Sequence, residues 1–253
     1  MKGLFSLVAA LGLSLALSAG VHAQTLTLEA DNWMPFNGDG KTDSGYMIDI
    51  AKAVFEPKGI QIKYSVTPWA RAIADVRSGK GNAVVGAGVD DVPDFVFPKE
   101  EQGLGAQEFY VRADSHWKYS GIQSLKGVKL AVIKDYTYFP ELDTYIKANP
   151  TSVVVGFGDD PLKDNLRLLL GGSADVVIDA TAVMAYTVDT MGLRSKVKKA
   201  GTGGEPLKMF IAFSPADPKS AEFANMLSAG MTGLRKSGEL KRILAKYGLT
   251  DWK

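Results

Sequence analysis

The order in which strand and helix patterns alternate limits most strongly what this chain can fold into. Apolar residues alternate over residues 26–30 and 60–66 and run together over 82–86, which predicts three strands. Helical spacing fills the two intervals between them, at 46–55 and 68–76. Because parallel strands need helical crossovers, this β-α-β-α-β order predicts a mainly parallel sheet covered by helices on both faces.

The same order recurs in the second half of the chain. Strands are predicted over residues 129–133, 153–157 and 174–178, and helices over 139–148 and 161–170. In both halves the second helix ends at a glycine, and the chain then enters a short apolar strand. The sequence therefore predicts an α/β fold built from two similar lobes.

Two extended segments, 107–112 and 206–213, link the halves, and two amphipathic helices follow at 219–237 and 239–247. Because the chain passes twice between the two halves, the first lobe is discontinuous. We expect the two linking segments to act as a hinge and the two lobes to have a cleft between them. The predicted boundaries are 24–108 plus 209–253 for the first lobe, 113–205 for the second lobe, and 109–112 and 206–208 for the hinge.

In open α/β sheets, ligands bind beyond the carboxyl ends of the strands. Applied to this chain, the rule indicates five segments that should meet at the cleft. They are residues 31–36, 68–71, 86–91, 134–138 and 179–181.

The first 23 residues are predicted to lie outside the fold. Lys2 supplies a positive charge, residues 4–17 form an apolar run, and the small residues Val21 and Ala23 precede Gln24. This pattern is typical of a secretory signal peptide that is cut after Ala23. The alternative is a transmembrane anchor, but the run is shorter than the roughly 20 residues that span a bilayer. We therefore expect an exported protein.

Charge and composition exclude several classes of function. The 29 basic and 28 acidic residues nearly cancel, which disfavours nucleic-acid binding because phosphate neutralisation needs clustered Lys and Arg. The chain has no Cys and two His, which excludes disulfides, thiol catalysis, a lipoprotein anchor and a Cys/His zinc site. We expect no metal and no cofactor, and the sequence shows no catalytic constellation.

Short segments with a recognisable order and spacing run along the chain from residue 26. They include aromatic-Met-Pro-Phe at 33–36, Gly-Tyr-Met-Ile-Asp at 45–49, Pro-Trp-x-Arg-Ala at 68–72, Gly-Lys-Gly-Asn-Ala at 79–83, Gly-Ser-Ala-Asp at 172–175 and Gly-Glu-Leu-Lys at 238–241. Together they resemble the family 3 extracellular solute-binding proteins, the periplasmic amino-acid-binding type. The Pro-Trp-x-Arg-Ala segment is similar to one branch of that family.

This resemblance implies the type II periplasmic binding protein fold, in which two α/β lobes are joined by two hinge strands. It implies a monomeric periplasmic protein that captures a small polar solute, an amino acid or a related compound, for an ABC-type transporter. Two alternatives stay open at this point. One is a ligand-sensing partner of a membrane signalling protein, and the other is an enzyme on the same scaffold, such as a cyclohexadienyl dehydratase.

The resemblance also implies which residues bind the ligand. Trp33 occupies the place of the aromatic residue that stacks on the ligand, and Trp69 lies where a helix start lines the cleft. Asp179 matches the acid that grips a ligand ammonium group. The loop that would hold a ligand carboxylate, through backbone amides and a hydroxyl group, contains Tyr136, Thr137 and Tyr138.

One departure from the family pattern affects the charge of the ligand. The family usually carries Thr-x-Glu-Arg after the third strand, and that Arg binds the ligand α-carboxylate. Here residues 88–98 are acidic and contain no Arg. Either Arg71 replaces the missing Arg, or Asp90 or Asp91 faces the cleft and the site favours a cation. We lean to Arg71, because Pro68 fixes the start of its helix, and we keep Asp91 as a second candidate contact.

Overall fold

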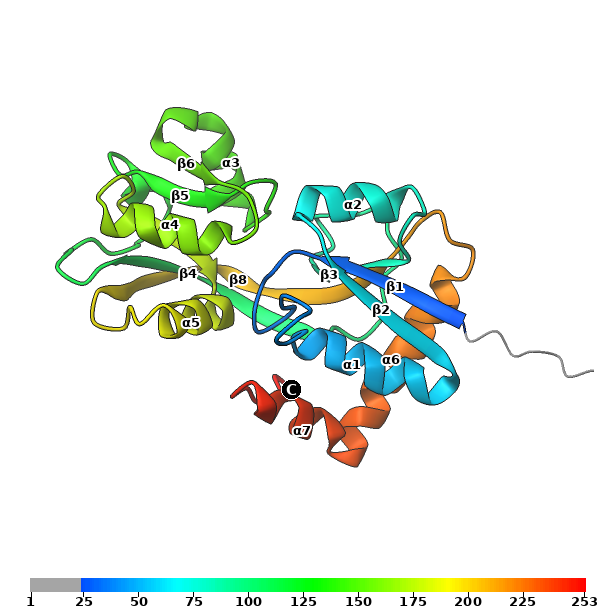
Figure 1. Cartoon of the computed structure of the whole chain (residues 1–253). Helices are drawn as coiled ribbons and strands as arrows, with labels where there is room; N and C mark the ends of the chain where they lie inside the picture. Colours follow the sequence, from blue (N-terminus) through cyan, green and yellow to red (C-terminus); the bar gives the residue numbers. More distant parts are fainter. Residues whose placement is uncertain (1–23) are drawn as a thin grey trace, which may run out of the picture.

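The computed structural model describes residues 24–253, so the predicted signal peptide and its cleavage site lie outside the described residues. The first lobe contains both ends of this part of the chain (Figure 1). Its elements are β1 (Gln24–Ala30), α1 (Tyr46–Phe55), the 3-10 helix η1 (Glu56–Lys58), β2 (Ile60–Val66), α2 (Trp69–Arg77), β3 (Ala83–Ala87), α6 (Ser220–Ser237) and α7 (Glu239–Lys246).

The second lobe repeats the alternation of strands and helices. Its elements are η2 (Ile122–Leu125), β5 (Leu130–Ile133), α3 (Pro140–Ala148), η3 (Pro150–Ser152), β6 (Val153–Gly156), α4 (Pro161–Leu170), β7 (Val176–Ala180) and α5 (Thr181–Thr190). Helix α5 was not predicted from the sequence. Among the described residues, no helix combines the length and the apolar character needed to cross a membrane.

The eight strands of the described residues form one sheet in the order β2-β1-β3-β8-β4-β7-β5-β6. In the first lobe β1 pairs in parallel with β2 and β3, and in the second lobe β5 pairs in parallel with β6 and β7. Strands β4 (Gly103–Arg112) and β8 (Val197–Phe213) run antiparallel to each other and connect the two groups (Figure 1). This arrangement confirms the predicted two-lobed α/β fold.

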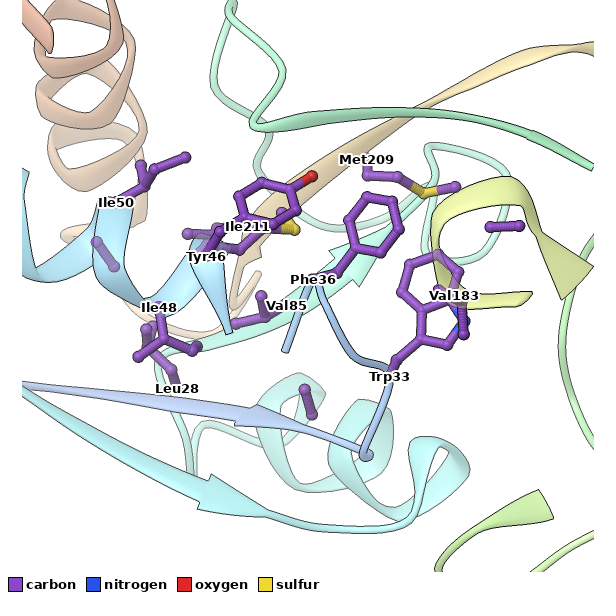
Figure 2. Packing of buried hydrophobic residues seen from close by; sticks show 14 of the residues in the cluster. Leu28, Trp33, Phe36, Tyr46, Ile48, Ile50, Val85, Val183, Met209 and Ile211 are labelled. Carbon is purple, nitrogen blue, oxygen red and sulfur yellow. The ribbon is translucent and has the colours of Figure 1, made fainter. Parts of the chain in front are cut away.

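The loop that follows β1 is held in one shape by local packing. The Trp33 backbone N–H donates to the Asn37 carbonyl at 2.8 Å, and the Trp33 and Phe36 rings stack with centroids 4.5 Å apart. Phe36 in turn packs on Tyr46 of α1, with ring centroids 5.3 Å apart. Figure 2 shows Trp33 at the edge of this cluster, and Trp33 lines a small pocket together with Val183 of α5. The first-lobe core therefore carries the Trp33 indole to the boundary between the lobes.

Candidate ligand-binding cleft

A cleft of about 730 Å³ lies between the lobes and takes residues from both. It opens at the carboxyl ends of the strands, because Asp31 follows β1, Gly88 follows β3, Tyr136 follows β5 and Asp179 lies near the end of β7. This is the position at which open α/β sheets bind ligands. The linking strands contribute Gln107 and residues 206–210.

Aromatic rings form part of the cleft wall. Trp33 and Trp69 are each 8% exposed and both line the cleft. The Trp33 ring meets the Tyr136 ring edge-on at 6.3 Å, and Tyr136 lies 6.4 Å from the Tyr138 ring. Since Trp33 and Tyr136 belong to opposite lobes, this aromatic contact bridges the cleft.

Two hydrogen bonds to buried carboxylates also join the lobes. The Trp33 indole Nε1–H donates to Asp179 Oδ1 at 2.9 Å, and the Tyr136 hydroxyl group donates to Asp31 Oδ2 at 2.5 Å. In each pair the carboxylate comes from one lobe and the donor from the other. The structure therefore shows the lobes in contact, with the cleft residues drawn together.

Burial raises the pKa of two cleft acids, Asp31 and Asp179. Asp31 is 8% exposed and Asp179 is 1% exposed. Loss of hydration raises the pKa of Asp31 from 3.8 to about 6, although the bond from Tyr136 lowers it in part. Loss of hydration likewise raises the pKa of Asp179 to about 7. The hydrogen bond from Trp33 lowers this pKa in part, and the charge of Asp31 raises it.

Two buried acceptors in the cleft have no donor among the described residues. They are Asp179 Oδ2 and Gln107 Oε1. Gln107 is 4% exposed, so its side-chain oxygen is as enclosed as the Asp179 carboxylate. Buried polar atoms normally have partners. The cleft therefore presents at least two oxygens that a bound molecule with N–H or O–H groups would satisfy.

A second group of acids lies around the loop that follows β3. Asp91 Oδ2 accepts from the Gly88 N–H at 2.7 Å, and the Thr137 hydroxyl group of the opposite lobe lowers the pKa of Asp91 by hydrogen bonding. Burial outweighs these contacts and raises that pKa, and the charges of Asp143 and Asp90 raise it further. All five of these residues line the cleft.

The structure brings most of the predicted contact residues together at this cleft. The ones that line it are Trp33, Trp69, Asp91, Tyr136, Thr137, Tyr138 and Asp179. Thr137 does not cap the helix that follows, because α3 has Phe139 at its N-cap position and no side-chain cap. What each of these residues does to a ligand stays a prediction.

The expectation that Arg71 faces the cleft is wrong in this structure. Its guanidinium pairs with Asp75 at 2.5 Å, its side chain is 65% exposed, and it is absent from the cleft lining. Trp69 is the first residue of α2 and packs inward. Two residues further along an α-helix amount to about 200° of rotation, so position 71 points to the opposite side.

Sequence reasoning did not select three of the polar residues that line the cleft. Asp31 lies in a segment that the strand-end rule indicated, but the aromatic residue of that segment was chosen instead. Asp143 lies within α3, and Gln107 lies inside a linking strand. No spacing or motif in the sequence distinguishes Asp143 or Gln107 from other polar residues.

In a comparison with known protein families, one family model matches nearly the whole described chain. The family model described as bacterial extracellular solute-binding proteins, family 3, matches residues 27–250. No curated protein matches the chain. The similar solved structures share less than a quarter of their sequence with it, so they support the fold alone.

Three of these structures illustrate the range of proteins that share this fold. A histidine kinase sensor domain with similarity to periplasmic binding proteins has a TM-score of 0.76 and 20% identity, and the match covers 90% of this chain and 98% of that one. A mutant of ArgBP from T. maritima has a TM-score of 0.73 and 18% identity, covering 88% and 94%. A structure from work on glutathione import through GshT and the cystine ABC importer TcyBC of Streptococcus mutans has a TM-score of 0.74 and 22% identity, covering 90% and 96%.

Proposed function

This chain belongs to the bacterial extracellular solute-binding proteins of family 3, and on that basis we propose that it captures a small polar solute in the cleft between its lobes. In this proposal it works outside the cytoplasm and delivers the solute to an ABC-type permease. The observation that carries the proposal is the cleft itself. Its volume of about 730 Å³ falls in the range of small-molecule sites, and both lobes contribute polar and aromatic groups to it.

The way the cleft is built supports capture by closure. A ligand favours the closed form only if it gains contacts there that the open form lacks. Here Trp33 and Asp31 come from the first lobe, and Tyr136 and Asp179 come from the second lobe. A solute that touches both pairs would hold the lobes together, as in the hinge closure of periplasmic binding proteins.

Native mass spectrometry of the freshly purified protein tests this proposal. We expect a fraction of the protein to carry a small molecule that is released on denaturation. The double substitution of Trp33→Ala and Trp69→Ala should abolish that adduct, since both indoles line the cleft. Trp117→Ala is the matched control, because Trp117 packs on Phe109 and is not among the lining residues. An adduct that survives the double substitution would show that the cleft is not the capture site.

An enzyme on the same scaffold is the second candidate function. The observation that favours it is the pair of buried acids, since the pKa of Asp31 rises to about 6 and that of Asp179 to about 7. Acids that titrate near neutrality suit general acid–base catalysis. Incubation of the protein with the molecule that co-purifies, followed by analysis for products, separates the two functions. An unchanged molecule supports capture, and its conversion supports catalysis.

The partner at the membrane is a separate part of the proposal. A permease and a sensor protein would both recognise the closed form, and a histidine kinase sensor domain shares this fold. Uptake of the co-purified solute in cells with and without the protein distinguishes the two. Loss of uptake supports delivery to a transporter, whereas unchanged uptake would favour a sensing role.

A further inference from the structure

We propose that the solute is an organic amine that carries two or more positive charges and no carboxylate, such as an aliphatic diamine or a guanidino amine. This inference rests on the proposed function and specifies the ligand of the same cleft. Five aspartates and two lysines line the cleft, and no arginine lines it among the described residues. The acids of the wall therefore outnumber its bases by three.

Only one of the two lysines, Lys147, acts on an acid that lines the cleft. Lys208 has a 64% exposed side chain, and its ammonium group lies 3.9 Å from the Glu101 carboxylate. Burial raises the pKa of Asp143, and the charge of Lys147 in the last turn of α3 opposes this only in part. Lys208 thus lies near an acid outside the cleft lining, and Lys147 acts on Asp143 alone. The other four lining aspartates form no ion pair among the described residues.

The acids form two groups, which is why we infer at least two positive charges. In the first group the charge of Asp31 acts on Asp179. In the second group the charges of Asp90 and Asp143 act on Asp91. In the first group Asp31 follows β1 and Asp179 lies near the end of β7, whereas the second group lies on the loop after β3 and on α3. A linear dication can place one charge at each group.

Unsatisfied acceptors support a donor-rich ligand independently of the charge count. Asp179 Oδ2 and Gln107 Oε1 are buried in the cleft and accept no hydrogen bond from the described residues. An ammonium group has three N–H donors and no acceptor, and a guanidinium has five donors. Trp33 and Trp69 also line the cleft, and aromatic rings attract either cation.

A carboxylate of the protein, Asp91, lies beside the loop that was predicted to bind a ligand carboxylate. Asp91 Oδ2 accepts the Gly88 N–H at 2.7 Å, and the Thr137 hydroxyl group lies close enough to oppose the rise that burial causes in the pKa of Asp91. Arg71, the predicted carboxylate anchor, pairs with Asp75 instead. A carboxylate on the ligand would therefore meet the Asp91 carboxylate, which already accepts the Gly88 N–H.

Three pairs of compounds test the inference, because the members of each pair differ by one carboxylate. They are cadaverine with lysine, putrescine with ornithine, and agmatine with arginine. We expect isothermal titration of the dialysed, full-length mature protein to show that at least one amine binds ten times or more tighter than its amino acid. The inference is overturned if in none of the three pairs the amine binds tighter than its amino acid, which includes the case in which none of the six compounds binds. The native mass spectrum decides separately whether the proposed function stands.

A substitution at Asp91 locates the second charge. Pentylamine has the length of cadaverine but one ammonium group, so we expect it to bind at least tenfold more weakly. Asp91→Asn should remove most of that difference and should also narrow the gap between cadaverine and lysine. Asp94→Asn is the matched control, because Asp94 lies on the same loop, pairs with Arg77 at 2.8 Å and does not line the cleft. Equal weakening of all three ligands by Asp91→Asn would indicate general damage and would refute the role given to Asp91.

Discussion

Replacement of Asp179 by Asn tests the electrostatics of the cleft without changing its shape. Asp179 Oδ1 accepts from the Trp33 indole and from the Ala180 N–H, and an Asn side-chain oxygen can keep both bonds. What the substitution removes is a titrating group. The pKa of Asp179 rises from 3.8 to about 7, mainly because burial disfavours its charged form.

The raised pKa fixes the sign of the effect on stability. Between pH 3.8 and about 7 the folded protein keeps a proton on Asp179 that the unfolded chain has lost, so stability falls as the pH rises through this window. The shift of roughly three pH units corresponds to about 4 kcal/mol, of which about 3 kcal/mol falls between pH 5 and pH 7. Asn does not titrate, so the Asp179→Asn protein should escape this loss.

Thermal unfolding of the dialysed protein at pH 5 and at pH 8 measures the effect. At about 2–4 °C per kcal/mol for a chain of this size, the drop in Tm between the two pH values should be smaller by about 6–12 °C in the Asp179→Asn protein. Asp114→Asn serves as the control, since the Asp114 side chain is 86% exposed. If the wild-type and Asp179→Asn proteins lose the same Tm between pH 5 and pH 8, the account of Asp179 as a buried, ionising acid is wrong.

Three further predictions follow from the same geometry. Tyr136→Phe leaves the buried Asp31 carboxylate without its donor at 2.5 Å, so it should destabilise the protein by about 1–3 kcal/mol at pH 8 and less at pH 5, as urea unfolding can measure. A bound solute should change the emission of Trp33 and Trp69, and a Trp33→Phe protein that shows the full change on titration would contradict the position of that indole. The exported protein should begin at Gln24, and N-terminal sequencing that finds residue 1 would refute the signal peptide.

The fold was largely predictable because its elements carry regular patterns. Helices α1 and α4 and strand β2 begin and end at the predicted residues. Helix α5 escaped prediction because its apolar residues are spread around the helix and do not form one stripe. Its burial comes from contacts with the sheet, which the sequence alone does not show.

Strand β8 was predicted too short for a related reason. The stretch that contains Gly201, Gly203 and Gly204 has weak strand character, yet it pairs with β4 along its length. A Cβ atom at Gly203 or Gly204 would lie 2.7–2.8 Å from the Phe139 ring, so the close packing of this aromatic residue requires glycine there. Tertiary contacts therefore decide the conformation of the segment.

The sequence did not show which side chains of the predicted segments point into the cleft. The strand-end rule located the segments that meet at the cleft, but it does not say which side chain of a segment points inward. Trp69 and Arg71 lie two positions apart on the same helix turn, yet Trp69 lines the cleft whereas Arg71 forms an exposed ion pair. Gln107 shows the same limit in a strand, where its inward direction depends on how β4 crosses between the lobes.

In the proposed mode of binding, the charge of the ligand and the closure of the lobes depend on the same two carboxylates. Asp31 bonds to Tyr136 and Asp179 bonds to Trp33, each across the cleft, so the enclosure of both acids depends on contact between the lobes. Enclosure of an ionised carboxylate without a positive partner costs free energy, which opposes closure of the empty protein at neutral pH. An ammonium group supplies the partner and removes the cost, whereas a neutral or anionic molecule leaves it in place. If the proposed cationic solute is correct, discrimination by charge arises from the closure equilibrium as a whole, because a cation favours the closed form more than a neutral or anionic molecule does.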